Sequence, residues 1–236
     1  ASPRAESAAG ARRHFRPRPL TTIATIVFCA VTIALGNWQT RRAEEKTAMD
    51  RAFIERTAAP PMPIGARKVD AYALQWSVVS ARGEWLPQHT VLLDNRVFRQ
   101  RAGYHVLTPL RLENSQTVVV VNRGWMPTGP SRTEPPQVPT PSGLVSITGT
   151  ATLPAAKWLE LRHVAPEGRV WQNFDMDQYR AATGLDIQPI VVLQASESPD
   201  ALVREWDRPS SGADRNRAYA VQWYSFAAIA LVLFIA

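Results

Sequence analysis

Two uncharged blocks constrain the fold of this chain more than any other feature. Residues 20–38 and 218–236 are each 19 residues long and contain no Asp, Glu, Lys or Arg. About 20 consecutive apolar residues cross the hydrocarbon layer of a bilayer as an α-helix, whereas a core helix of a soluble protein normally keeps a polar face. The sequence therefore predicts two transmembrane helices, although the mean hydropathy of the whole chain is slightly polar at -0.18.

The two blocks divide the chain into five segments. Residues 1–19 carry five arginines and one glutamate, which predicts a basic disordered arm beside the membrane. Residues 39–57 contain neither Gly nor Pro, so the first membrane helix is expected to continue out of the bilayer until Pro60. Residues 58–217 form the middle domain. The second membrane helix, 218–236, ends within an apolar run, and we expect further residues beyond Ala236.

The middle segment has the pattern of a β-rich domain. Seven short runs rich in Val, Ile, Leu, Trp or Tyr are separated by polar or Gly/Pro residues: 75–81, 91–96, 103–111, 117–122, 144–150, 170–173 and 190–194. This spacing favours a mainly antiparallel barrel or sandwich. Six prolines within residues 127–142 predict an extended surface loop. Asp175, Gln178 and Gly184 have the spacing that caps a short helix between the last two strands.

Composition and motifs argue against several classes of function. Of the net charge of +7, +4 lies in the first 19 residues, so the basic excess is typical of a membrane flank and not of a nucleic-acid groove. The single cysteine, Cys29, allows no intrachain disulfide, iron–sulfur cluster or covalently attached haem. His14, His89, His105 and His163 match no metal-binding spacing. We expect no metal site and, without a nucleophile motif, no enzyme activity.

The predicted topology places both termini in the cytoplasm and the middle domain outside it, because long domains are translocated with little regard to charge. The sequence is rich in Ala, Arg and Pro, which favours a bacterial cell membrane over a mitochondrial one. The overall prediction is a membrane protein in which two transmembrane helices flank a mainly β extracytoplasmic domain.

Aromatic and basic residues gather where the two helices meet the same face of the bilayer. The aromatic residues there are Trp38, Tyr219, Trp223 and Tyr224, and the arginines just above them are Arg41, Arg42, Arg215 and Arg217. Interfacial anchoring is one explanation. The other is a site for haem or for a partner helix, in which flat aromatic faces line the ligand and arginines pair with its acidic groups. Gln39 and Gln222 could then supply polar contacts between the helices.

A second candidate segment ends a predicted buried strand and leads into the proline-rich loop. It contains Asn122, Arg123, Gly124 and Trp125, and Gly124 predicts a bulge or a tight bend. A buried Arg123 would need a carboxylate or backbone carbonyls as partners. Two interpretations stay open, a structural corner and a partner-contact surface. The candidate partner-binding residues are Arg42, Asn122, Arg123, Trp125 and Tyr224.

Together, these segments resemble the surfeit locus protein 1 family. The shared residues run in order from Leu35 to Tyr224: Leu35-Gly36-x-Trp38-Gln39-x-x-Arg42, Arg82-Gly83, Gly103-x-x-x-x-Thr108-Pro109-Leu110, Val121-Asn122-Arg123-Gly124-Trp125-x-Pro127, Trp171-x-x-x-Asp175 and Tyr219-x-x-x-Trp223-Tyr224. The resemblance implies a cytochrome c oxidase biogenesis factor that assists haem a insertion or maturation of the catalytic subunit, without covalent chemistry. The alternative is a non-catalytic accessory subunit bound stably to the oxidase or to a respiratory supercomplex.

One position departs from the family pattern. The family usually carries a histidine three residues before the tyrosine of the second span, where it is proposed to ligate haem, and this chain has Asn216 there. Asparagine is a poor iron ligand. The resemblance therefore implies transient, non-covalent contact with haem a, with partners in the oxidase subunits, the catalytic subunit first, and in the lipid bilayer. The residues assigned to this haem or partner site are Trp38, Gln39, Arg215, Arg217, Tyr219 and Trp223.

Overall fold

The computed structural model describes residues 18–129, 135–154, 168–207 and 212–236. The chain falls into two compact units: unit 1 comprises Ala1–Asp50 and Pro209–Ala236, and unit 2 comprises Arg51–Arg208. The predicted basic arm, apart from its last two residues, lies outside the described part of the chain, as does His163.

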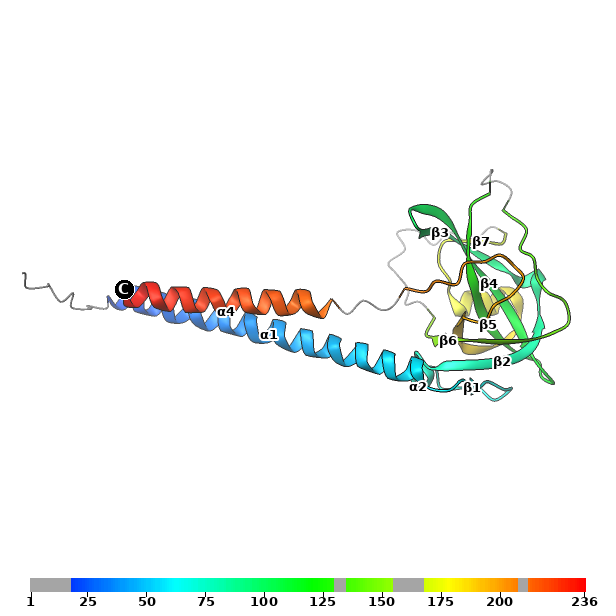
Figure 1. Ribbon diagram of the computed structural model, residues 1–236, viewed down its shortest axis with the longest axis horizontal. Helices are drawn as coiled ribbons and strands as arrows, with labels where there is room; N and C mark the ends of the chain where they lie inside the picture. The colour runs from blue at the N-terminus through cyan, green and yellow to red at the C-terminus, as the bar shows by residue number, and fades with distance from the viewer. Residues whose placement is uncertain (1–17, 130–134, 155–167, 208–211) are drawn as a thin grey trace, which may run out of the picture. The chain divides into compact units, whose positions relative to one another are not determined.

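Unit 1 is built from two long helices (Figure 1). Helix α1, Pro19–Ala58, has 40 residues without interruption, and helix α4, Ala213–Ile235, has 23. The length and apolar composition of both fit a membrane span. Helix α1 continues through residues 39–57 as predicted and ends before Pro60, which has no N–H to extend it. Helix α4 begins five residues earlier than expected, with Asp214 in its first turn, where the helix dipole favours a negative charge.

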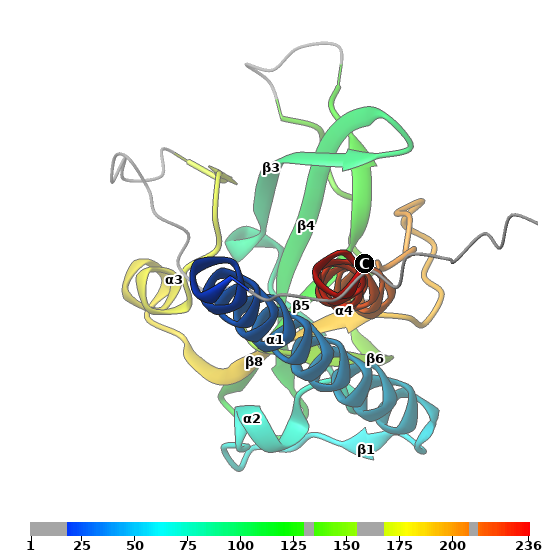
Figure 2. The same ribbon diagram turned by 90° about the vertical axis from the view of Figure 1, so that its left-hand side faces the viewer.

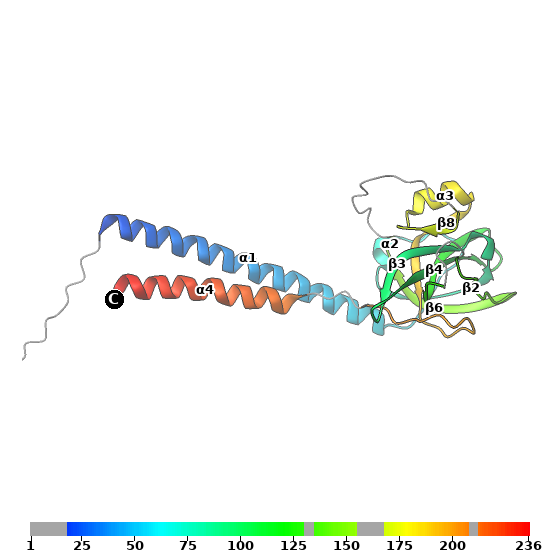
Figure 3. The same ribbon diagram turned by 90° about the horizontal axis from the view of Figure 1, so that it is seen from above.

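The two helices run antiparallel along a seam of small and polar residues (Figure 3). The buried residues are Thr32, Gly36 and Ala43 in α1 and Ala213, Ala220 and Ala227 in α4. The α4 alanines recur every seven residues, and Gly36 and Ala43 are also seven apart, which is the spacing of coiled-coil packing. Small side chains suit a membrane, where helices associate by close backbone approach and not by the hydrophobic effect.

Unit 2 is organised around one eight-stranded sheet (Figure 2). The strands are β1 Met62–Pro63, β2 Val78–Trp85, β3 Val91–Phe98, β4 Arg101–Leu112, β5 Thr117–Pro127, β6 Leu144–Thr152, β7 Val170–Trp171 and β8 Asp186–Gln194. Their order is β1-β2-β6-β8-β5-β4-β3-β7, and an additional pairing of β2 with β4 closes β2, β6, β8, β5 and β4 into a ring. Within this ring only β5 and β8 are parallel. The predicted β-rich domain is confirmed as a mainly antiparallel barrel.

Alternating apolar residues of the ring strands fill the barrel. The core cluster includes Val79, Leu110, Val121, Ile190 and Val192, all 1% exposed or less. This alternation follows from the period of two along a strand, which turns every second side chain inward. The barrel is therefore held together by aliphatic packing without any disulfide.

Three short helices connect the strands: α2 Ala71–Leu74, the 3-10 helix Pro87–His89 and α3 Met176–Thr183. Helix α3 confirms the predicted caps. The Asp175 side chain accepts hydrogen bonds from the backbone of Asp177 and Gln178, and Gly184 ends the helix at a φ of 67°. Tyr179 of α3 then packs edge-on against Trp171, with ring centroids 5.7 Å apart.

Several element boundaries differ from the predictions. The first predicted strand begins at Val78 and not at residue 75, because the chain first forms α2 and then passes through Trp76 at a φ of 67°. Strand β5 continues five residues past Asn122, to Pro127. In the proline-rich segment, residues 135–142 form neither helix nor strand, as expected, but the Pro139 carbonyl accepts a hydrogen bond from the interior. This part of the segment is therefore a loop that also supplies a hydrogen-bond acceptor to a buried side chain.

Candidate functional site

The two halves of the helical motif touch through Gly36 and Tyr224. A Cβ atom at position 36 would lie 2.5 Å from Cε1 of Tyr224, so only glycine leaves room for this ring. The Tyr224 hydroxyl donates to Oδ1 of Asn37 at 2.7 Å and lies 3.4 Å from Oγ1 of Thr40. The segments around Trp38 and Trp223, far apart in the sequence, are thus two sides of one interhelical contact.

Asn216 lies in the seam and is engaged at both ends of its amide group. Its Nδ2 donates to Oε1 of Gln39 at 2.5 Å, and its Oδ1 accepts from Nζ of Lys46 at 2.7 Å. Gln39 therefore makes the predicted contact between the helices. The same expectation is wrong for Gln222, which is exposed on the outer side of α4.

The remaining candidates of unit 1 lie on the outside of the helix pair. Trp38 and Tyr219 are each 48% exposed, and Arg215 is exposed as well. Arg217 donates to Asp214 at 3.0 Å and to Thr47 at 3.1 Å. Exposed ion pairs of this kind contribute little stability, so Arg217 can exchange its partners for a ligand.

Trp223 and Arg42 each contact a residue of their own helix. Trp223 packs edge-on against Phe226 at 5.8 Å, and Arg42 pairs with Glu45 at 2.9 Å. These contacts leave part of the Trp223 ring and most of the Arg42 side chain on the surface. The structure therefore gathers aromatic and basic groups at one level of the helix pair, as the sequence predicted, on an open surface and not around a closed cavity.

The groups at this level do not fit an axially ligated haem. The described part of unit 1 contains no histidine. The residue at the position where the family usually has a histidine is Asn216, whose amide is already hydrogen-bonded twice. Cys29 lies deep in the apolar stretch of α1, with Sγ 3.6 Å from the Ala227 carbonyl. Among the described residues, no group of three or more His, Cys, Asp and Glu side chains is placed to hold a metal ion.

The second candidate segment forms a β-bulge centred on Arg123. The pairing of β4 with β5 passes from Val106↔Gly124 to Leu107↔Asn122, which leaves Arg123 as the extra residue. Gly124 has a φ of 142°, a conformation that other residues rarely adopt. The predicted bulge is confirmed. The glycine within an otherwise apolar strand was the sequence signal that indicated it.

The Arg123 side chain is fully buried and surrounded by acceptors. It donates to Oδ2 of Asp200 at 2.8 Å, to the Pro139 carbonyl at 2.7 Å and to Oγ1 of Thr140 at 2.8 Å. Its guanidinium also lies 5.0 Å from the ring centroid of Trp85. A carboxylate and a backbone carbonyl are thus both present, as a buried arginine requires.

Asp200 links this arginine to a second one. Arg204 donates to both carboxylate oxygens of Asp200, at 2.7 and 2.6 Å. Burial alone would raise the pKa of Asp200, but the hydrogen bonds from Arg204 and Arg123 outweigh it and hold the pKa below its ordinary value. Burial lowers the pKa of Arg123, and its bond to Asp200 opposes that shift.

The neighbours of Arg123 are buried too. Asn122 and Trp125 are each 6% exposed. The Trp125 indole donates through Nε1 to the Arg96 carbonyl at 2.8 Å, and its ring packs on Phe98 at 5.3 Å. We therefore revise the prediction that Asn122, Arg123 and Trp125 contact a partner directly, because their side chains are covered by unit 2 itself. The structural-corner interpretation accounts for them.

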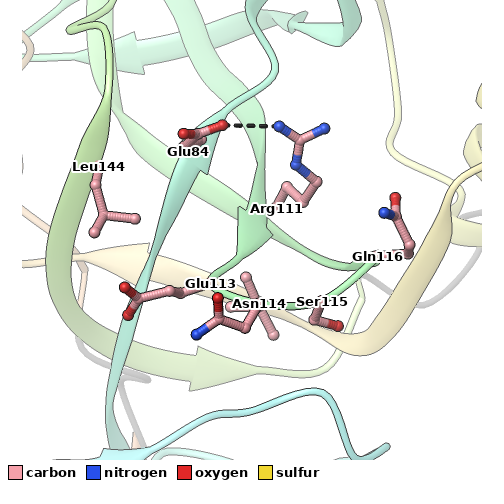
Figure 4. A pocket seen from close by; sticks show the side chains of 8 residues that line it. Glu84, Arg111, Glu113, Asn114, Ser115, Gln116 and Leu144 are labelled. Carbon is pink, nitrogen blue, oxygen red and sulfur yellow. Dashed lines mark hydrogen bonds and ion pairs between the residues drawn. The ribbon is translucent and has the colours of Figure 1, made fainter.

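An open hollow that the sequence did not indicate lies at the turn between β4 and β5 (Figure 4). It has a volume of about 610 Å³ and is lined by Glu84, Arg111, Leu112, Glu113, Asn114, Ser115, Gln116 and Leu144. The principal charges pair with each other, since Arg111 donates to Glu84 at 2.8 Å. Because Arg111 and Glu84 neutralise each other, neither is free to attract an ionic ligand.

Comparison with known proteins identifies the family to which this chain belongs. The profile described as the SURF1 family matches residues 26–228, which include most of both long helices, α1 and α4, and all of unit 2. This chain belongs to the SURF1 family. Every candidate residue of the helical motif and of the β5 bulge lies inside the matched range.

Relatives of the chain come from distant organisms. It is 21% identical over 217 residues to a SURF1-like protein of Monosiga brevicollis, covering 87% of this chain and 82% of that protein. A SURF1-like protein of Rickettsia bellii is 22% identical over 227 residues, with 91% and 89% coverage. Surfeit locus protein 1 of Mus musculus is 24% identical over 173 residues, which cover 66% of this chain and 56% of the mouse protein. The chain thus matches little more than half of the mouse protein's length.

Proposed function

We propose that this SURF1-family chain acts in the biogenesis of cytochrome c oxidase, as a two-pass membrane protein that assists maturation of the catalytic subunit. Its termini lie in the cytoplasm and unit 2 on the other side of a bacterial cell membrane. Membership of the SURF1 family supports a role in oxidase biogenesis. The observation that carries the proposed site is the contact of Tyr224 with Gly36, which brings the two halves of the family motif to one level of the helix pair.

The mode of action that we propose is non-covalent binding and not catalysis. The exposed rings of Trp38 and Tyr219 and the half-buried ring of Trp223 offer flat apolar surface, and Arg215 and Arg217 offer charges that pair with carboxylates. These groups suit a helix of an oxidase subunit that ends in an acidic segment. Contact with haem a would use the same faces, with the propionates on the arginines and without an iron ligand from position 216.

One observation favours the alternative of a permanently bound accessory subunit. Asn216 is committed to Gln39 and Lys46, so the position assigned to haem ligation in the family serves here to join α1 to α4. A chain that had given up haem handling could still keep the aromatic and basic surface for binding the oxidase. Both functions predict association with the oxidase, and they differ in haem absorbance and in persistence of the complex.

The deciding experiment is the optical spectrum of the detergent-purified full chain after co-expression with haem a synthesis, together with the identity of co-purifying proteins. Haem a absorbance that falls at least fivefold on replacing Trp38 and Trp223 with leucine supports a role in haem a transfer. Absence of haem, with stable association with the assembled oxidase, supports the accessory subunit. Deletion of the gene without any loss of assembled oxidase would refute the proposed function in both forms.

A further inference from the structure

The hairpin that joins β3 to β4 has a two-residue turn built from unfavourable residues. Val97 pairs with Ala102 and Phe98 with Arg101, so Arg99 and Gln100 form the turn. Their φ angles are 45° and 63°. Hairpin turns with two positive φ angles favour Asn-Gly, since a larger side chain in this region meets its own backbone. Such a turn persists only where its surroundings impose it.

Aromatic and charged contacts hold this hairpin on the barrel. The Phe98 ring packs on Trp125, and the Trp125 indole is bonded to the Arg96 carbonyl. The Arg99 guanidinium lies 5.0 Å from the centroid of the Phe98 ring and donates to Glu205 at 2.9 Å. The tip is therefore presented in a fixed conformation, which reduces the entropy that a partner must remove on binding.

The outer surface of the tip is small, apolar and basic. Val97 is 68% exposed, and its neighbours in the turn and the following strand, Gln100, Arg101 and Ala102, are also exposed. None of the ion pairs formed between described residues involves Arg101. The pair of Arg99 with Glu205 is open to solvent on both sides, with side chains 72% and 61% exposed, so another carboxylate can replace Glu205 at little cost.

We propose that this hairpin tip, residues 97–102, is the surface through which unit 2 binds an acidic extracytoplasmic segment of an oxidase subunit. The identity of the partner rests on the proposed function. The chemical class of the partner is inferred from the tip itself. Its two arginines bind carboxylates in bidentate geometry, and Val97 and Ala102 pack against the apolar part of the partner segment that lies between those carboxylates.

The composition of the tip favours a protein partner over a lipid surface. Loops that insert into the membrane interface use large groups such as Trp, Phe and Leu. The only aromatic residue of the tip, Phe98, is turned toward Trp125, and the outward residues are Val97 and Ala102. Arginine rather than lysine is also the basic residue enriched in protein interfaces.

The test is photo-crosslinking of the full chain in native membranes, with a photoreactive amino acid at position 97. The expected product is an adduct with an oxidase subunit that falls at least fivefold in Arg101→Glu. Arg67→Glu is the matched control, because Arg67 is an exposed arginine elsewhere on unit 2, and it should leave the adduct unchanged. The reagent at position 72, where Tyr72 is 76% exposed, controls for general accessibility and should give no such adduct.

Any of three results would overturn the inference: a lipid adduct alone, no protein adduct, or a protein adduct that Arg101→Glu leaves unchanged. Oxidase content separates this failure from failure of the proposed function. If gene deletion lowers the oxidase while Val97→Asp/Arg101→Glu keeps it at the wild-type level, the inference is wrong and the proposed function stands. If deletion leaves the oxidase intact, the proposed function is wrong, and an Arg101-dependent adduct with some other protein would overturn the assignment of the partner.

Discussion

Arg123 shows how a single buried cation fixes a corner of the barrel. Its three acceptors come from Asp200, Pro139 and Thr140, so the side chain joins β5 to two other segments. Removing Arg123 leaves the Pro139 carbonyl and the Thr140 hydroxyl without this donor, while Arg204 still pairs with Asp200. Leaving a buried polar group without its hydrogen-bond partner costs about 1–3 kcal/mol. We expect Arg123→Leu to destabilise unit 2 by about this amount and Arg123→Lys by less, since lysine keeps the charge but not the planar fork.

Urea unfolding of the full chain in detergent, followed by the tryptophan fluorescence of unit 2, measures this effect. Arg111→Leu is the control, because the Arg111 pair with Glu84 is exposed on both sides and should contribute under about 1 kcal/mol. If Arg123→Leu unfolds at the wild-type urea concentration but lowers oxidase content, a direct contact role would have to be reinstated for this residue.

His105 gives unit 2 a dependence on pH. Burial, followed by the charge of Arg96, lowers the pKa of His105 from 6.5 to about 4, and Asp207 only partly opposes this. The folded state therefore holds His105 neutral where the unfolded chain binds a proton. Titration of His105 therefore leaves the free energy of unfolding unchanged above about pH 6.5. Between pH 6.5 and 4 it lowers the free energy of unfolding as the pH falls, by at most about 1.4 kcal/mol per pH unit.

The measurement is the unfolding midpoint in urea at pH 7.5, 6.0 and 4.5. His105→Gln removes the titrating group and keeps a polar side chain of similar length, so its midpoint should vary less over this range than that of the wild type. Asp200 titrates below its ordinary range and does not contribute between pH 6 and 7.5. Equal pH dependence in both proteins would show that His105 is not the titrating group.

At the scale of elements, the α1–α4 seam depends on its polar links. Hydrogen bonds between membrane helices contribute about 0.6–2 kcal/mol each, and Asn216 makes two of them. We expect Asn216→Leu to weaken the helix pair by about 1–2 kcal/mol and leave the Lys46 ammonium without its acceptor. Asn216→Asp keeps an acceptor for Lys46 and should retain most of the pairing.

Helix pairing can be followed by oxidative crosslinking of the native Cys29 to a cysteine at position 227, because Cys29 Sγ lies 3.6 Å from the Ala227 carbonyl. The crosslink should form more slowly in Asn216→Leu than in Asn216→Asp. Gln222→Leu serves as the control, since Gln222 is exposed on α4. Identical rates in all three would mean that the apolar seam alone sets the register.

Elements decided by local chemistry were predictable from the sequence, and those decided by distant pairing were not. The caps of α3, the bulge at Gly124 and the extension of α1 each depend on residues a few positions apart. The closure of the ring by β2 and β4, and the parallel pairing of β5 with β8, depend on register between segments that no local pattern specifies. The burial of Arg123 could not be predicted from local sequence either, because its carboxylate partner, Asp200, is 77 residues away along the chain.

The candidate site followed the same rule. Family motifs predicted which residues of α1 and α4 lie at one level, because both helices must cross the same interface. They did not predict that Asn216 would bridge Gln39 and Lys46, since that depends on the rotation of each helix about its axis. Nor did they predict the turn at Arg99 and Gln100, because these residue types are unfavourable at positive φ.

At the scale of the whole molecule, the boundary between the two units falls inside a continuous helix. Unit 2 begins at Arg51, although α1 continues to Ala58. The last turns of α1 belong to unit 2 by packing: the Phe53 ring meets Trp76 edge-on at 6.0 Å, and Arg56 donates to the Gln75 carbonyl at 2.6 Å. The barrel therefore uses the end of a membrane helix as part of its own fold.

This division predicts that residues 51–208 fold without either membrane span, because the barrel ring and its core lie within them. The fragment 59–208 should fold with lower stability, by about 1–2 kcal/mol, since it lacks the aromatic contact of Phe53 and the hydrogen bond of Arg56. Urea unfolding of both fragments, and of 51–208 carrying Phe53→Ala/Arg56→Ala, provides the measurement. The double variant should match 59–208 if these two contacts carry the effect. Equal stability of 51–208 and 59–208 would instead place the end of α1 outside the cooperative fold of unit 2.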